Sequence, residues 1–152
     1  MKRNQGFTVV ELLIVIIIIA IIAVIALPQF INAQDRGKQS QTVANMRSIS
    51  NAMALYHTDK NKYPTASNIT AVKDALLSGN YMAKVPTIDG WGQEFQVSSI
   101  DRTYTIWSCG KGKGANGCNL VTGEPIGEIN SFESQIIITD GAFTQYPAGT
   151  QQ

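Results

Sequence analysis

Few residues of this chain have the types and spacing that chemistry requires. The single histidine, His57, stands beside Thr58 and Asp59, and no Ser-His-Asp or Cys-His arrangement can be built around it. Cys109 and Cys118 enclose a glycine-rich loop, but two cysteines without partner histidines do not make a zinc site. The loop also lacks the Gly-Lys-Ser/Thr ending of a phosphate-binding loop. We therefore expect no enzyme, no catalytic residue and no metal centre.

Glu11 is the one charged residue whose position demands an explanation. It lies a turn inside the apolar run Phe7–Leu27, and no polar residue follows it until that run ends. A lone carboxylate in the hydrocarbon region costs a few kcal/mol, less near the interface, and usually has a partner. The simplest interpretation is that Glu11 reaches back to the lipid head groups. The alternative is that a specific partner neutralises it.

The run that holds Glu11 is long enough to cross a membrane. A helix over Phe7–Leu27 would be about 32 Å long, close to the thickness of the hydrocarbon core. A cleavable secretory signal would need small residues after the run, but Leu27 is followed by Pro28 and Gln29. An ordinary single-span anchor fits the length, yet it explains neither Glu11 nor the junction Gly6-Phe7.

The remaining composition is that of a small polar domain. The chain has 152 residues, 44% of them hydrophobic, and a formal net charge of +1. This length suits one domain, and much of the apolar content lies in the first thirty or so residues. No basic patch or stripe appears, so we expect no nucleic acid as a partner.

The segment Gly6-Phe7-Thr8-Val9-Val10-Glu11-Leu12-Leu13 resembles the cleavage and anchor motif of type IV prepilins and type II secretion pseudopilins. A basic leader precedes it, and Pro28 falls where many members of that family carry a proline. The resemblance implies that a prepilin peptidase cuts between Gly6 and Phe7 and methylates the new amine of Phe7. It also implies that Glu11 pairs with the Phe7 amine of an adjacent subunit during assembly, and we favour this role over the head-group interpretation.

The resemblance carries a set of partners and a location. The chain would polymerise with copies of itself, after contacts with the prepilin peptidase, an inner-membrane assembly platform and minor pilins or pseudopilins. It would lie in the inner membrane as a precursor and then in a periplasmic or cell-surface filament. The domains that follow are a leader (1–6), a transmembrane and filament-core helix (7–28) and a periplasmic or extracellular globular domain (29–152).

A single long helix is expected from Thr8 to about Asn61. Apolar residues recur at steps of three or four after Gly37, with polar residues between them, so the second half is amphipathic. Pro28 lacks an amide donor and is expected to kink the helix. The segment from Pro28 to Gly37 is a candidate for local unwinding in a filament, as the resemblance implies. The helix should end before Tyr63-Pro64.

The second half of the sequence alternates in the manner of strands. A short helix capped by Asn68 precedes it. We expect a hairpin from 94–98 and 103–108 with its turn at 99–102, a third strand at 135–139 and a fourth at 143–146. A long helix followed by an antiparallel sheet is an α+β fold, the pilin fold that the resemblance implies.

Two further segments resemble the major pseudopilin of type II secretion. They are Asp89–Phe95 and Tyr104–Gly110, and in that family the tryptophan corresponding to Trp91 is a core anchor. This chain departs by having Gly90 in place of proline and by carrying a cysteine in the loop that follows.

The exported location favours a disulfide between Cys109 and Cys118. On the chain-entropy model, closing a loop of this length stabilises by about 2.5–3 kcal/mol. The resembled pseudopilins bind calcium in the loop after this strand. Here that region offers a thin set of oxygen ligands without EF-hand spacing, so the disulfide is favoured over calcium. The candidate calcium ligands would be Asn116, Asn119, Glu124 and Glu128.

These observations point to a structural subunit of a helical filament. The segment around Trp91 favours the major pseudopilin of a type II secretion pseudopilus. The disulfide and the long tail after Cys118 suit the major pilin of a type IV pilus, which remains the alternative. A different class of function is a single-span, membrane-anchored periplasmic binding domain, in which Glu11 would have no special role.

Overall fold

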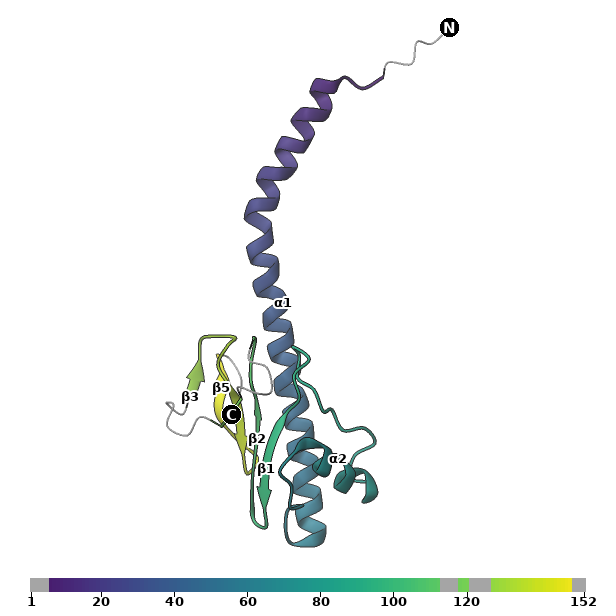
Figure 1. Ribbon diagram of the computed structural model, residues 1–152, viewed down its shortest axis with the longest axis vertical. Helices are drawn as coiled ribbons and strands as arrows, with labels where there is room; N and C mark the ends of the chain where they lie inside the picture. The colour runs from purple at the N-terminus through teal and green to yellow at the C-terminus, as the bar shows by residue number, and fades with distance from the viewer. Residues whose placement is uncertain (1–5, 113–117, 121–126, 149–152) are drawn as a thin grey trace. The chain divides into compact units, whose positions relative to one another are not determined.

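The computed structural model describes residues 6–112, 118–120 and 127–148. Two helices precede five strands in this part of the chain (Figure 1). The elements are α1 (Val9–Lys60), α2 (Ile69–Ser78), β1 (Gln96–Ile100), β2 (Thr103–Ser108), β3 (Gly127–Ile129), β4 (Ile136–Thr139) and β5 (Ala142–Pro147). The α+β fold and the predicted order of elements, a long helix before a small sheet, are confirmed.

Helix α1 is continuous over Val9–Lys60, as the sequence predicts. Pro28 lies inside it without ending it. The helix ends where Asn61 adopts a left-handed conformation with φ 56° and donates its N–H to the carbonyl of His57 at 2.7 Å. The predicted kink at Pro28 and the predicted unwinding toward Gly37 in a filament stay predictions.

The chain divides into two compact units, Met1–Asp35 and Arg36–Gln152. The described part of the first unit comprises residues 6–8 and the N-terminal part of α1. Its large apolar side chains are exposed throughout, from Phe7 to Ile31. Such a surface is stable only in contact with lipid or with other apolar helices.

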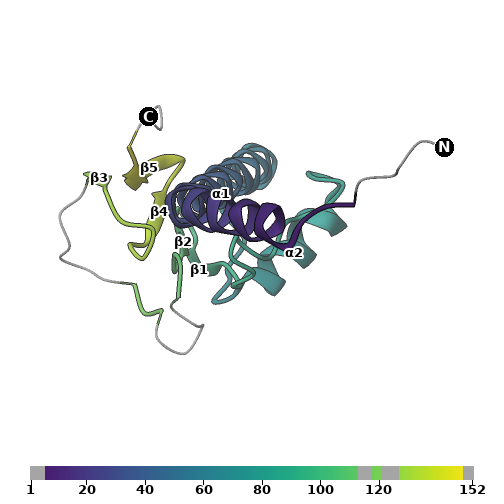
Figure 2. The ribbon, with the colours of Figure 1, turned by 90° about the horizontal axis from the view of Figure 1, so that it is seen from above.

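The described part of the second unit forms one hydrophobic core, to which both helices and the sheet contribute. Figure 2 shows the strands grouped on one side of the second half of α1. The predicted amphipathic face of α1 supplies Met46, Ile49 and Met53, all fully buried. Side chains from the rest of the unit complete this core: Ala66, Ile69, Val72, Leu76, Val85, Phe95, Val97, Tyr104, Ile106, Ile129, Ile136, Ile138 and Phe143.

Helix α2 begins as the sequence predicts. The side-chain oxygen of Asn68 accepts a hydrogen bond from the N–H of Ala71 at 2.8 Å, which satisfies one of the free donors of the first turn. Ile69, Val72 and Leu76 are its buried residues.

The sheet has the strand order β1-β2-β4-β5-β3. The first hairpin is real, but its turn is shorter than predicted, because Ile100 pairs directly with Thr103 and only Asp101 and Arg102 remain in the turn. Asp101 has φ 52°, as a two-residue turn requires, and an aspartate tolerates this conformation.

Strand β3 departs from the predicted antiparallel sheet. It pairs with β5 in parallel, whereas the other three pairings are antiparallel. It has three residues, Gly127–Ile129, which is too short for a period-two pattern to be visible in the sequence. The predicted sheet is therefore correct for β1, β2, β4 and β5 and incomplete at this edge.

Candidate functional site

The N-terminal motif forms a reciprocal cap on α1. The carboxylate oxygen Oε2 of Glu11 accepts hydrogen bonds from the backbone N–H and the hydroxyl of Thr8, both at 2.8 Å. In return, the Glu11 N–H donates to the Thr8 hydroxyl oxygen at 3.2 Å. This is a capping box, in which two otherwise unpaired donors of the first turn are satisfied. Within a single subunit, Glu11 therefore has a local partner.

The predicted cleavage junction is accessible. The Phe7 side chain is 83% exposed, and Gly6 is exposed with open space where a β-carbon would be. Residues 1–5 of the predicted leader lie outside the described residues. An exposed segment just before a helix is the kind of substrate that a peptidase can reach.

Helix α1 is the one helix in the described part of the chain that is long and apolar enough to cross a membrane. Its most apolar stretch has no buried residue. The carboxylate of Glu11 lies at the N-terminal end of this stretch, where the cap holds it against the helix start.

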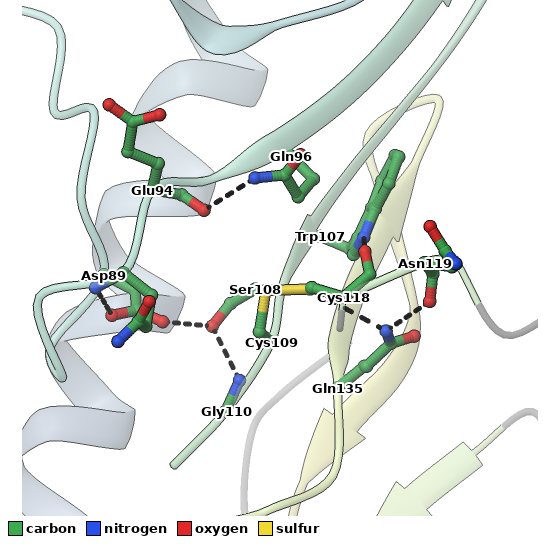
Figure 3. The surroundings of a disulfide bond; sticks show 11 residues. Asp89, Glu94, Gln96, Trp107, Ser108, Cys109, Gly110, Cys118, Asn119 and Gln135 are labelled. Carbon is green, nitrogen blue, oxygen red and sulfur yellow. Dashed lines mark hydrogen bonds between the residues drawn. A yellow bond between two sulfur atoms is a disulfide. The ribbon is translucent and has the colours of Figure 1, made fainter. Parts of the chain in front are cut away.

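Asp89 organises the loop before the sheet (Figure 3). Its Oδ1 atom accepts from the backbone N–H groups of Trp91 and Gln93, both at 2.9 Å. Its Oδ2 atom accepts from the Ser108 hydroxyl at 2.7 Å, at the end of β2. Asp89 is 4% exposed, and these three hydrogen bonds satisfy its buried carboxylate. It ties the 89–93 loop to the strand that leads into the cysteine loop.

The same loop packs tightly against α1 through Gly90. Its N–H donates to the Thr42 hydroxyl oxygen at 2.9 Å, and that hydroxyl donates to the Lys38 carbonyl at 2.8 Å. Proline, the residue of the resembled family, could not make the first of these bonds. Trp91 is only half-buried and is not part of the hydrophobic core, so the role of core anchor implied by the resemblance is not seen here.

The predicted disulfide between Cys109 and Cys118 is present, with the two α-carbons 5.4 Å apart. Both cysteines are buried, at 0% and 4% exposure. Two side chains of the sheet region bind the backbone of Cys118 and Asn119. Trp107 Nε1 donates to the Cys118 carbonyl at 3.1 Å, and Gln135 Nε2 donates to the Asn119 carbonyl at 2.7 Å (Figure 3). The disulfide and these two hydrogen bonds thus tie Cys118 and Asn119 to the end of β2 and to the start of β4.

The possible calcium ligands are only partly described. Asn116 and Glu124 lie outside the described residues, whereas Asn119 and Glu128 are exposed. Within the described ranges, no group of three His, Cys, Asp or Glu side chains could hold a metal ion. That the protein binds no calcium in this region stays a prediction.

His57 belongs to an aromatic cluster. Its ring lies 4.6 Å from that of Tyr63, which in turn lies 4.7 Å from the buried ring of Tyr104. The Tyr104 hydroxyl shares a 2.7 Å hydrogen bond with Ser50. These contacts join the end of α1 to β2 and give His57 a packing role.

The sequence carries two family matches that together span most of it. The model of the prokaryotic N-terminal methylation motif matches residues 1–27, the segment that contains the cap. The model described as type II secretion system protein G matches residues 29–122, from the end of the apolar stretch through the disulfide.

The chain belongs to the type II secretion system protein G family.

Curated proteins similar to this chain include both secretion and pilus subunits, at moderate identity. Type II secretion system core protein G of Aeromonas hydrophila is 29% identical over 108 residues, which cover 64% of this chain and 75% of that protein. The fimbrial protein EcpC of Eikenella corrodens is 34% identical over 117 residues, or 77% of this chain and 72% of that protein. The type IV major pilin PilA of Myxococcus xanthus is 42% identical over 66 residues, or 43% of this chain and 30% of that protein. No solved structure gives a significant match.

Sequence reasoning missed three contributors to these sites. The spacing of Thr8 and Glu11 is that of a capping box and could have revealed the cap. The Asp89–Ser108 and Gly90–Thr42 contacts join residues that are far apart in the chain, and no local pattern indicates them.

Proposed function

We propose that this protein is the major pseudopilin of a type II secretion-like pseudopilus, polymerised through its N-terminal helix. The match to protein G over residues 29–122 carries this proposal. The exposed apolar half of α1 supports it, because that surface needs lipid before assembly and neighbouring helices afterwards. A heterologous contact that does not close then generates an open helical polymer.

Processing at the N-terminus is part of the proposal. A prepilin peptidase cuts between Gly6 and Phe7 and methylates the Phe7 amine. The match to the N-terminal methylation motif and the exposure of both residues support this step. The leader is then residues 1–6, the membrane and filament-core helix 7–28, and the exported domain 29–152.

Glu11 has capacity for a partner from another subunit. Both hydrogen bonds that its side chain accepts use Oε2, and Oε1 accepts none from the described residues. The Phe7 amine of an adjacent subunit is a cation that Oε1 can accept from when two α1 helices lie side by side. This charge-assisted bond sets the register between subunits.

The remaining partners follow from processing and assembly. The precursor lies in the inner membrane, where it meets the peptidase and an assembly platform. Minor pseudopilins and further copies of this chain join it in a periplasmic filament.

A type IV pilus is the second candidate, and one observation favours it. The fimbrial protein EcpC aligns with 77% of this chain, a larger share than the 64% that protein G of Aeromonas hydrophila covers. In that case the filament reaches the cell surface, where the disulfide stabilises the exposed domain against unfolding.

Imaging and mass analysis of the host test both proposals. Short periplasmic filaments, lost on deletion of the gene together with secretion, support the pseudopilus, whereas long surface fibres support the pilus. The mature protein is expected to begin at a methylated Phe7. A mature chain that still begins at Met1 would contradict the processing step, and a host without any filament would contradict both candidates.

A further inference from the structure

A groove of about 820 Å³ lies within the second unit, between α1 and the edge of the sheet. Its larger apolar lining residues are Val43 of α1, Ile129, Phe132 and Pro147. Ile129 and Pro147 are buried, and Val43 and Phe132 are half-buried, so the groove has an apolar floor that is partly open to solvent.

Arginines stand at both ends of this floor. Arg36 and Arg47 both line the groove from α1, about three helical turns and roughly 16 Å apart on the same side of the helix. The guanidinium of Arg47 lies 5.4 Å above the ring of Phe143, which holds it over the sheet. The groove therefore combines apolar side chains with an arginine toward each end.

The turn between β1 and β2 has the complementary properties. Ile100 is 68% exposed, the highest value for a large apolar side chain in the described part of the second unit. Asp101 follows it in the turn, and its carbonyl accepts from the Tyr63 N–H at 2.6 Å. The turn thus presents an apolar side chain and a carboxylate from a backbone that is already fixed.

The groove and the turn lie at opposite ends of the sheet. Strand β1 runs toward Ile100, and the antiparallel pairings through β2 and β4 make β5 and its parallel neighbour β3 run the other way. Pro147 and Ile129 therefore lie at the opposite end of the sheet from the β1–β2 turn. That β1–β2 turn lies beside the C-terminal end of α1 (Figure 1). Two such surfaces cannot meet within one subunit, but they can join successive copies head to tail.

We propose that the Ile100–Asp101 turn of one subunit docks in the groove of the next. Ile100 lies against Val43 and Phe132, and Asp101 pairs with Arg36. The inference rests on the proposed function, because only a polymerising chain brings successive copies into this relation. It assigns a contact between exported domains, separate from the apolar helices that form the filament core.

Cysteine crosslinking in assembled filaments tests this contact directly. Ser40 lines the groove and is exposed, so the full-length double variant Ile100→Cys with Ser40→Cys should form a ladder of covalent oligomers under mild oxidation. The native cysteines are already paired and do not compete. The matched control is Ile88→Cys with Ser40→Cys, since Ile88 is a similarly exposed isoleucine (51%) away from the turn. Only monomers are expected from this control.

Charge variants within the turn provide a second readout. Asp101→Asn removes the charge while tolerating the left-handed backbone, and we expect several-fold fewer filaments. Arg102→Gln alters the neighbouring residue of the same turn and should leave filament yield unchanged. Asp74→Asn, at an exposed acid on α2, should also leave it unchanged.

The outcomes separate this inference from the proposed function. A ladder that is specific to the Ile100 pair, with a loss confined to Asp101→Asn, supports the docking. Wild-type filaments without a ladder, or with full yield from Asp101→Asn, overturn the docking and leave the filament function intact. Absence of wild-type filaments overturns the filament function itself.

Discussion

Gly90 lies so close to Lys38 that a β-carbon at position 90 would be 2.2 Å from the Lys38 carbonyl oxygen. The obstacle is helix backbone and cannot rotate away. This contact, together with the bond from the Gly90 N–H to Thr42, sets the distance between the 89–93 loop and α1.

Replacing Gly90 with alanine should destabilise the protein by about 1–3 kcal/mol, because loop and helix must separate. The matched control is Gly37→Ala, at an exposed helical glycine with open space around it, which should stabilise by about 0.5–1 kcal/mol. Denaturant titration of the full-length protein in detergent, followed by tryptophan fluorescence, measures both. Equal effects at the two positions would show that the close approach to Lys38 is unimportant.

The two roles of Glu11 can be separated by changing either partner of the cap. Thr8→Ala removes the cap, which costs about 0.5–2 kcal/mol of helix stability, but keeps the carboxylate. Glu11→Gln keeps a neutral acceptor for the cap and removes the charge.

We expect filaments from Thr8→Ala and none, or misregistered ones, from Glu11→Gln, with normal membrane insertion of both. Electron microscopy and membrane fractionation provide the measurements. Normal filaments from Glu11→Gln would sink the assembly role and leave capping as the function of Glu11.

Reduction of the disulfide should lower the free energy of unfolding by about 2.5–3 kcal/mol on the chain-entropy model. Denaturant titration of the wild type with and without a thiol reductant tests this value. The double variant Cys109→Ser with Cys118→Ser should show the lower stability and no response to the reductant. A wild type that is insensitive to complete reduction would mean that Trp107 and Gln135 hold the loop without help from the disulfide.

Alkaline pH should unfold the domain partly through Tyr104. Burial raises the pKa of Tyr104 above its ordinary value of 10.0, and the hydrogen bond with Ser50 opposes that rise only in part. Because the folded state holds this proton more tightly than the unfolded state, stability is full below about pH 10 and falls as pH rises through the folded-state pKa.

Tyr104→Phe removes this proton and should flatten the loss of stability above pH 10. Near neutral pH the same variant should be less stable by about 1 kcal/mol, because Ser50 loses its partner. Denaturant titrations at a series of pH values measure both effects. Burial also raises the pKa of Tyr63, so a smaller alkaline loss should remain. An unchanged pH profile would assign the loss to other groups.

Local patterns in the sequence predict most of the secondary structure. The three-and-four spacing from Val43 to Tyr56 places the amphipathic face of α1 correctly, and Asn68 marks the start of α2. Each of these signals depends on residues within a few positions of one another. The predicted turn at 99–102 is wrong at its start, because the exposed Ile100 completes β1 and pairs with Thr103.

Contacts between distant segments are where sequence reasoning fails. Strand β3 forms by pairing in parallel with β5, which lies later in the chain. Nothing in the sequence around Asp89 indicates that its carboxylate accepts a hydrogen bond from Ser108. The cap is an exception, since the spacing of Thr8 and Glu11 indicates it.

The wholly exposed apolar half of α1 has a consequence for reversibility. Lipid tails are about as apolar as the leucine and isoleucine side chains of neighbouring helices, so moving this half from membrane to filament gains little hydrophobic free energy. The hydrophobic free energy of this half is then nearly the same in the membrane and in the filament. A few polar groups, together with external work, decide whether the subunit enters the filament. The apolar side chains of this half therefore do not by themselves commit the subunit to the filament.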